Sequence, residues 1–244
     1  MDWTAPNDTA LIVVDVTYDF LPPDGALKVD RGEEVIPVIN DLVPHFRKRI
    51  WTKEDHHPHH RFFASSHPGK KPLDIMETEF GGQYLWPDHS IAGTRGSEFH
   101  SSLRMDKDDM VVIKGTNPEI HAYSAVYMDD RKTIIHYEDG KTLPEKLRDK
   151  GIKKIVATGL AYDFCAGLTA YDLAKEGFSV LFVRDASRSI GISVGEGRTT
   201  IDIMDDMLKE AGVAIIDSHE LPQALGIKGP YSRLISPLSR PNQT

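Results

Sequence analysis

The amino-acid sequence predicts an α/β fold with three layers, in which helices cover both faces of a central, mostly parallel sheet of six strands. Short apolar runs rich in β-branched residues alternate with amphipathic stretches along most of the chain, and this alternation is typical of strand–helix–strand units. The first run, from Ala10 to Val16, is apolar except for Asp15. A strand that is apolar on both faces is what a sheet covered by helices on both sides requires.

Composition and charge limit the classes of partner. The chain has 244 residues, of which 40% are hydrophobic, and its formal net charge is −8. We expect one large domain over residues 1–225 and a C-terminal tail over residues 226–244. The acidic balance, and the lack of a basic run interleaved with aromatic residues, argue against nucleic acid as a partner.

The cellular setting is predicted from three further features. No apolar stretch approaches the roughly 18 residues of a membrane-spanning helix, so no membrane partner is expected. The first residues lack the charged, apolar and small-residue succession of a signal peptide. The chain has a single cysteine, which suits a reducing compartment. We therefore expect a cytoplasmic protein, and the sequence is compatible with a homo-oligomer.

The remaining elements follow in chain order. Five more strands are expected at residues 50–53, 110–114, 155–159, 179–183 and 213–216, and helices at residues 33–46, 143–148 and 199–211, with another that begins at Cys165. Pro44 should kink or shorten the first helix. Asn117 followed by Pro118 predicts one more helix start. Residues 64–97 show no regular pattern, which predicts a functional loop or lid.

Cys165 is the first candidate for chemistry. An apolar run stops at Gly159, and Cys165 follows within six residues. An amphipathic stretch begins at the cysteine. A thiol at a helix N-terminus faces unpaired N–H groups and the helix dipole, so its pKa should fall from about 8.5 toward neutrality. A nucleophile is one interpretation. The other is a small buried residue that packs a helix on the sheet.

Four reactive side chains fall at the C-terminal ends of predicted strands, where ligands bind in open parallel sheets. They are Asp15, Asp55, Lys114 and Cys165. Cys165 can attack a carbonyl carbon, Asp15 can accept the thiol proton and pass it to a leaving amine, and Lys114 can balance the charge. The three residue types are chemically consistent with nucleophilic hydrolysis by a thiol, and the choice of Asp15 as the base rests partly on the family resemblance described below.

A histidine-rich segment follows the second strand and predicts a metal site. In an extended chain Asp55 and His57 face the same side while His56 faces away. His89 is a plausible third ligand, with His60 as an optional fourth. One divalent metal ion is expected, with zinc first and iron or manganese as alternatives. The other interpretation is an exposed polar turn.

Five motifs resemble those of the nicotinamidase/pyrazinamidase branch of the isochorismatase-like cysteine hydrolases. They are ALIVVDVTYDF, EDHHP, WPDHSIAGTRG, VIKGTNPEIHAYSAV and GLAYDFCAG, and the resemblance runs from about Ala10 to Asp217. It implies the isochorismatase-like hydrolase fold and hydrolysis of nicotinamide to nicotinate and ammonia through a cysteine thioester, a step of NAD salvage. The catalytic aspartate, lysine and cysteine would be Asp15, Lys114 and Cys165.

The resemblance also implies roles for other residues. The backbone N–H groups of Ala161 and Cys165 would form an oxyanion hole, with a cis peptide between Leu160 and Ala161. The metal, on Asp55, His57 and His89, would hold the pyridine nitrogen. The small-molecule substrate would bind in an apolar slot, for which the candidates are Phe20, Trp86, Tyr123 and Leu160.

Departures from the family pattern leave the substrate range open, and a different class of function is weighed beside it. The family usually has Gln-Asn in place of Thr17-Tyr18 and a small polar residue in place of Tyr162, which affects the shape of the pocket. A related hydrolase could act on an N-carbamoyl compound or another small amide, or on isochorismate. A nucleotide-binding module without catalysis would need a glycine-rich phosphate loop, and the loop after the first strand has none.

Overall fold

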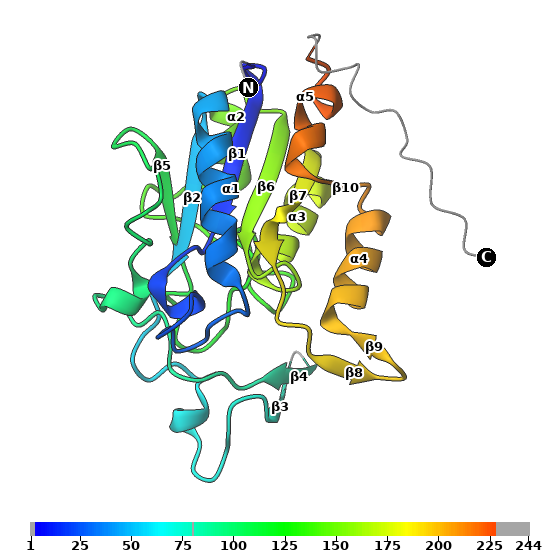
Figure 1. Cartoon of the computed structure of the whole chain (residues 1–244). Coiled ribbons are helices and arrows are strands. Elements are labelled where there is room, and N and C mark those ends of the chain that lie inside the picture. Colours follow the sequence, from blue (N-terminus) through cyan, green and yellow to red (C-terminus); the bar gives the residue numbers. More distant parts are fainter. Residues whose placement is uncertain (1–2, 80, 228–244) are drawn as a thin grey trace, which may run out of the picture.

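A parallel sheet of six strands forms the centre of the molecule (Figure 1), as predicted. The computed structural model describes residues 3–79 and 81–227. The strand order is β10-β7-β6-β1-β2-β5, and every neighbouring pair is parallel. The strands are β1 (Thr9–Val14), β2 (Arg49–Glu54), β5 (Met110–Lys114), β6 (Lys154–Leu160), β7 (Ser179–Arg188) and β10 (Ala214–Ile216).

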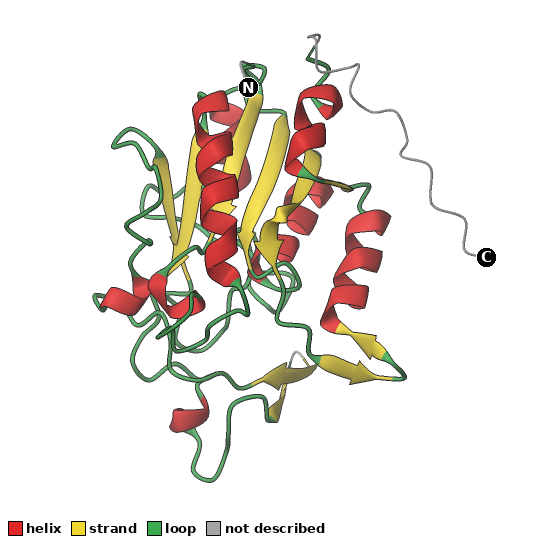
Figure 2. Cartoon of the chain, in the orientation of Figure 1, coloured by secondary structure: helices red, strands yellow, loops and turns green. Residues whose placement is uncertain are grey.

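Helices cover both faces of the sheet and complete the three layers (Figures 1 and 2). Side chains of α1 (Val35–Leu42) and α5 (Leu221–Ala224) belong to the core cluster on one face. Those of α2 (Leu143–Asp149), α3 (Cys165–Lys175) and α4 (Thr200–Glu210) belong to the cluster on the other. Successive side chains of β1 point to opposite faces of the sheet. Leu11 and Val13 therefore belong to the first cluster, and Ile12 and Val14 belong to the second.

Local sequence signals set the ends of several helices. α1 is shorter than predicted because the chain tightens into a 3-10 turn that contains Pro44. α2 begins with a capping box, in which the Thr142 hydroxyl accepts from the Glu145 N–H and the Glu145 carboxylate accepts from the Thr142 N–H. The predicted helices at residues 143–148 and 199–211 are therefore present within one or two residues.

The helix expected after Asn117 and Pro118 is absent from this described segment, and that prediction was wrong. The Asn117 side chain accepts from the Glu119 N–H and closes a turn that does not continue. The carbonyl of Ala122 accepts instead from the Lys114 ammonium. Tertiary contacts of the segment thus replace the helical hydrogen bonds that the local sequence favours.

Along the chain, two hairpins and several 3-10 helices separate the strands of the main sheet. The irregular stretch at residues 64–97 contains the hairpin of β3 (Ile75–Thr78) and β4 (Gly81–Tyr84), and a second hairpin, β8 (Ser193–Gly195) and β9 (Arg198–Thr199), precedes α4. Short 3-10 helices occur at Tyr18–Phe20, Gly32–Glu34, Val43–His45, Ala64–Ser66, Arg95–Ser97 and Ser218–Glu220.

Two expectations concern the ends and the surroundings of the chain. The tail predicted at residues 226–244 falls almost entirely on residues 228–244, which lie outside the described residues. Among residues 3–79 and 81–227, the structure contains no helix that is both long and apolar enough to cross a membrane.

Candidate active site

The reactive side chains predicted from the sequence meet at the C-terminal edge of the sheet. Asp15 directly follows β1, Lys114 ends β5, and Cys165 begins α3 after the turn that follows β6. All three side chains are almost completely buried. The structure therefore brings together the three residues that the sequence placed at separate strand ends.

Lys114 is the centre of this group. Its Nζ lies 2.8 Å from Asp15 Oδ2 and 2.6 Å from Glu54 Oε1, it donates to the Ala122 carbonyl at 3.0 Å, and it lies 3.5 Å from Cys165 Sγ. Burial by itself lowers the pKa of the lysine, but the neighbouring Asp15 carboxylate and other negative groups raise it well above its ordinary value. The raised pKa favours the charged ammonium, which lies 3.5 Å from the Cys165 sulfur.

Asp15 is held in place by the neighbouring strand β2. Its backbone is left-handed, with φ of 52°, and its N–H donates to the Thr52 carbonyl at 3.0 Å. The Thr52 hydroxyl donates to Asp15 Oδ1 at 2.6 Å. Burial raises the pKa of the Asp15 carboxyl above its ordinary value, although the Lys114 ammonium opposes this shift. A carboxylate with a raised pKa is a better proton acceptor.

The thiol of Cys165 does not have the lowered pKa that we expected from its position at a helix start. Burial raises the pKa well above its ordinary value, and the attraction of Lys114 does not compensate. Lys114 carries one positive charge while Asp15 and Glu54 can supply two negative ones, so a thiolate would add a further negative charge to a buried site. A Cys165 thiol with a raised pKa would have to lose its proton before it could act as a nucleophile.

The turn between β6 and α3 presents backbone N–H groups beside the thiol. The peptide bond between Leu160 and Ala161 is cis, as the family resemblance implies. The Tyr162 N–H donates to the Arg188 carbonyl at 2.8 Å, whereas in the described chain the N–H groups of Ala161 and Cys165 donate to no backbone carbonyl. These two N–H groups are free to serve a substrate oxygen.

A cluster of buried histidines adjoins the triad. His56, His89 and His121 each offer a ring nitrogen within 4.8 Å of the others, a spacing that could hold a metal ion. The Nδ1 atoms of His56 and His89 contact the carbonyls of Gly115 and Pro87 at 2.9 and 2.7 Å. A carbonyl can only accept, so each Nδ1 carries the proton.

Glu54 links the histidines to the triad. Its Oε2 lies 3.1 Å from His56 Nε2 and 3.4 Å from His89 Nε2, while Oε1 pairs with Lys114. One carboxylate oxygen therefore lies within contact distance of two imidazole nitrogens. Burial alone raises the pKa of Glu54, but Lys114 holds it well below the usual range, so the carboxylate is charged. A carboxylate oxygen and imidazole nitrogens that converge in this way are a donor set that fits a divalent metal.

Comparisons with known proteins agree with this geometry. Residues 9–199 match the model of the isochorismatase domain. The chain belongs to the isochorismatase domain family. It is 37% identical over 188 residues to a nicotinamidase of Acinetobacter baylyi, with 77% of this chain and 84% of the relative aligned.

Solved structures of the same family are similar to this chain. A nicotinamidase/pyrazinamidase of Acinetobacter baumanii has a TM-score of 0.80 and 34% sequence identity, covering 88% of this chain and 99% of that one. A pyrazinamidase of Pyrococcus horikoshii in complex with zinc has a TM-score of 0.65 and 28% identity, covering 86% and 99%.

Two of the predicted metal ligands lie elsewhere in this isochorismatase-family protein. The Asp55 carboxylate accepts from the Lys53 ammonium at 2.8 Å, and the His57 side chain is exposed. Both line a separate hollow beside β5. The prediction ended the second strand one residue early, and a shift of one residue moves a side chain to the opposite face. Glu54 and His56 therefore occupy the positions that we had expected for Asp55 and His57.

The other two predicted ligands do lie at the cluster. His89 is one of its three members. His60 is buried, its ring centroid is 4.7 Å from that of His56, and its Nε2 has no hydrogen-bond partner among the described residues. His121 was missed, because a lone histidine after an Asn-Pro turn carries no sequence signal of ligation.

The pocket over Cys165 has an aromatic lining. Phe20, Trp86 and Tyr123 line it, as expected, and Trp86 Nε1 donates to the Tyr123 hydroxyl at 2.6 Å. The remaining lining residues are Leu27, Glu54, His89, His121, Ala161, Phe164, Cys165 and Ile190. Leu160 is not a lining residue, because its side chain belongs to the core cluster beneath α1.

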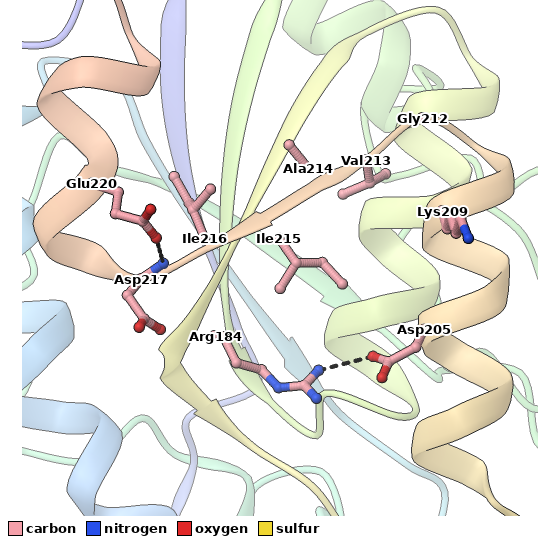
Figure 3. A pocket seen from close by; sticks show the side chains of 10 residues that line it. All are labelled: Arg184, Asp205, Lys209, Gly212, Val213, Ala214, Ile215, Ile216, Asp217 and Glu220. Carbon is pink, nitrogen blue, oxygen red and sulfur yellow. Dashed lines mark hydrogen bonds and ion pairs between the residues drawn. The ribbon is translucent and has the colours of Figure 1, made fainter. Parts of the chain in front are cut away.

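A further hollow, larger than the pocket over Cys165, lies over β10 and α4 (Figure 3). Its volume is about 730 Å³, and at one side Arg184 pairs with Asp205 at 3.1 Å. Neither cysteine nor histidine lines this hollow in the described chain. Its size alone does not make it a reactive site, and the chemistry is concentrated at Cys165.

Proposed function

We propose that this protein is a nicotinamidase, which hydrolyses nicotinamide to nicotinate and ammonia. The observation that carries the proposal is the contact of Cys165 Sγ with Lys114 Nζ, itself paired with Asp15, at the base of an aromatic pocket. The 37% identity to a nicotinamidase supports the choice of substrate. The aromatic lining suits a planar ring amide.

The first half of the reaction forms a thioester. Cys165 Sγ attacks the amide carbon while its proton passes to the Asp15 carboxylate, and the carbonyl oxygen becomes an oxyanion. The N–H groups of Ala161 and Cys165 would hold that oxyanion, with a contribution of about 3 kcal/mol for each well-placed donor. Asp15 then returns the proton to the nitrogen, the carbon–nitrogen bond breaks, and ammonia leaves.

The second half repeats these steps with water. Asp15 takes a proton from water, whose oxygen attacks the thioester carbon. The carbon–sulfur bond then breaks, Asp15 returns its proton to the sulfur, and nicotinic acid leaves as nicotinate with loss of its carboxyl proton to solvent. Lys114 stays protonated throughout, because its buried carboxylate partners raise its pKa. The lysine thereby keeps Asp15 ionised between proton transfers and offsets negative charge on sulfur.

The metal is proposed to be zinc, bound at the histidine cluster with His56 and His89 as ligands next to Glu54. The zinc complex of the Pyrococcus horikoshii pyrazinamidase supports this choice, and neutral imidazole nitrogens with a carboxylate are common zinc donors. When bound there, the ion would hold the pyridine nitrogen and orient the ring. Iron and manganese are the alternatives that the test has to separate.

The proposed setting is the cytoplasm, where a single free thiol stays reduced, and a homo-oligomer is compatible with the function. The alternative function is hydrolysis of an N-carbamoyl compound or another small amide by the same thiol chemistry. Its basis is the lining by Ile190 and Phe164, two residues that the family resemblance did not assign.

The test is ammonia release from nicotinamide by metal-replete protein, compared with benzamide and an N-carbamoyl amine. We expect rapid release from nicotinamide, slow release from benzamide because it lacks the ring nitrogen, and none from Cys165→Ala. Metal analysis of the active protein identifies the ion. Release only from the N-carbamoyl compound, or full turnover by Cys165→Ala, would overturn the proposal.

A further inference from the structure

His121 is a buried side chain for which the proposed reaction gives no role. It is 2% exposed, and neither ring nitrogen has a hydrogen-bond partner in the described part of the chain. A neutral imidazole has one nitrogen with a free lone pair, which in this position meets no donor among the described residues. A buried polar group without a partner costs on the order of 1–3 kcal/mol, which calls for an explanation.

Packing alone does not explain the residue. The ring of His121 lies over that of Tyr123, with centroids 4.2 Å apart and planes tilted by 39°. A phenylalanine would fill this position without burying two unpaired nitrogens. The ring instead points a nitrogen toward those of His56 and His89, within 4.8 Å of both.

A cation would supply the partner that His121 lacks. It would bind a nitrogen of His121 next to the Nε2 atoms of His56 and His89, which already converge on the Glu54 carboxylate. The Nδ1 contacts of His56 and His89 with backbone carbonyls are those that orient histidine ligands of metals. His121 has no such contact among the described residues, and its ring is held by packing against Tyr123 and Phe62.

The chain next to His121 leads to the catalytic lysine. The carbonyl of Ala122 accepts from Lys114 Nζ at 3.0 Å, and that Nζ lies 3.5 Å from Cys165 Sγ. The segment around His121 is an irregular turn between β5 and α2, so no helix or strand fixes the carbonyl. A ligand bond at His121 would fix it.

We propose that His121 is a ligand of the same metal ion as His56 and His89, and that this bond positions Lys114 against the thiol through the Ala122 carbonyl. The inference rests on the metal centre of the proposed function, and not on the identity of the substrate. The metal then has two roles, since it orients the substrate and also orders a positioning segment of the catalytic group. His121 is thus a metal ligand and a positioning residue.

The first experiment measures ligation without turnover. His121→Phe keeps the packing on Tyr123 and removes the nitrogens, and His57→Ala is the control because His57 is exposed. Chelator competition should show at least a tenfold weaker affinity for zinc in His121→Phe and no change in His57→Ala. The visible spectrum of the cobalt(II) protein should change only in His121→Phe. Equal affinity and an unchanged spectrum in His121→Phe would overturn the proposal.

The unmodified protein gives an independent answer if His121→Phe fails to fold. X-ray absorption at the zinc edge of the full-length zinc protein reports the number of imidazole ligands. Three or more are expected, and two would contradict ligation by His121. In His121→Asn, which retains a polar side chain, the number of imidazole ligands should be lower by one.

The second experiment measures the link to the thiol. Cys165 is the only cysteine, so alkylation by iodoacetamide reports this thiol alone. Removal of the metal should change the alkylation rate several-fold in the unmodified protein and not in His121→Phe. A rate that responds to metal equally in both would contradict the positioning role. Nicotinamide turnover is scored separately, so metal-dependent alkylation in a protein inactive on nicotinamide would support this inference and refute the proposed substrate.

Discussion

Glu54 and Lys114 form a buried ion pair, with 2.6 Å between Oε1 and Nζ, and the other oxygen of the same carboxylate faces His56 Nε2 at 3.1 Å. One side chain thus joins the cysteine triad to the histidine cluster. Because both partners are buried, neither charge can be satisfied by water if the other is removed. The role of Glu54 is therefore open to direct tests.

Replacement of Glu54 by glutamine should impair the enzyme strongly. The substitution keeps the shape, removes the negative charge next to Lys114 and weakens the cation site. We expect kcat/KM for nicotinamide to fall by about 100-fold and zinc affinity by about 10-fold or more. The matched control is Asp55→Asn, which alters the adjacent, partly exposed carboxylate and should leave both quantities within about twofold. Equal effects of the two substitutions would refute the assignment of Glu54.

Asp15→Asn should remove the proton acceptor. The amide oxygen can still accept from Thr52, whereas the amide nitrogen then replaces Oδ2 opposite the Lys114 ammonium and the ion pair is lost. Loss of a general base typically lowers kcat by about 10²–10⁴-fold, and we expect a decrease in this range together with a lower melting temperature. Asp24→Asn, at an exposed loop position, serves as the control. Steady-state kinetics with nicotinamide give the result, and retained kcat would exclude Asp15 as the base.

The ionisation of Cys165 provides a pH prediction. Burial raises its pKa, so alkylation in the free protein should increase with pH and reach its midpoint above the ordinary thiol value of about 8.5. The negative charge of Asp15 contributes to this shift. Asp15→Asn should therefore move the midpoint downward, even though it lowers kcat. A midpoint well below the ordinary thiol value in the unmodified protein would show instead that the helix N-terminus and Lys114 dominate.

Asp129 should make stability depend on pH. Burial raises its pKa to about 7, and Oδ2 has no hydrogen-bond partner in the described residues. The folded state holds this proton more tightly than the unfolded state. The stabilising contribution of the protonated carboxyl is therefore present below about pH 4 and is lost as the pH rises through about 7. Asp129→Asn should remove this part of the pH dependence of the free energy of unfolding.

The measurement for Asp129 is thermal unfolding of metal-free protein between about pH 4 and about pH 8, on either side of the raised pKa. Relative to the unmodified protein, Asp129→Asn should gain melting temperature at the alkaline end and show little gain at the acid end. Each kcal/mol corresponds to about 2–4 °C for a chain of this size. Asp130→Asn, on the neighbouring and partly exposed carboxylate, tests whether the effect belongs to burial. A gain that is the same at both ends would contradict the raised pKa.

Continuous apolar runs were enough to predict the sheet and most of the helices. A run such as Ala10 to Val14 has no polar face, so burial on both sides is its only stable arrangement. The parallel order then places the ends of β1, β5 and β6 at one edge. For this reason the grouping of Asp15, Lys114 and Cys165 could be inferred from the order of apolar runs along the chain.

Only the tertiary structure decided which side chains form the histidine cluster and in which direction the pKa of the Cys165 thiol shifts. Whether Glu54 or Asp55 faces inward depends on where β2 ends, and one residue of register reverses the answer. His121 reaches the cluster because its turn packs against Lys114, a contact between segments that no local pattern specifies. The raised pKa of Cys165 likewise comes from burial and from charges that only folding brings together. Local sequence determines which strands and helices can form. The face to which a side chain at a strand end points, and the electrostatics of a buried site, depend on the contacts of the folded protein.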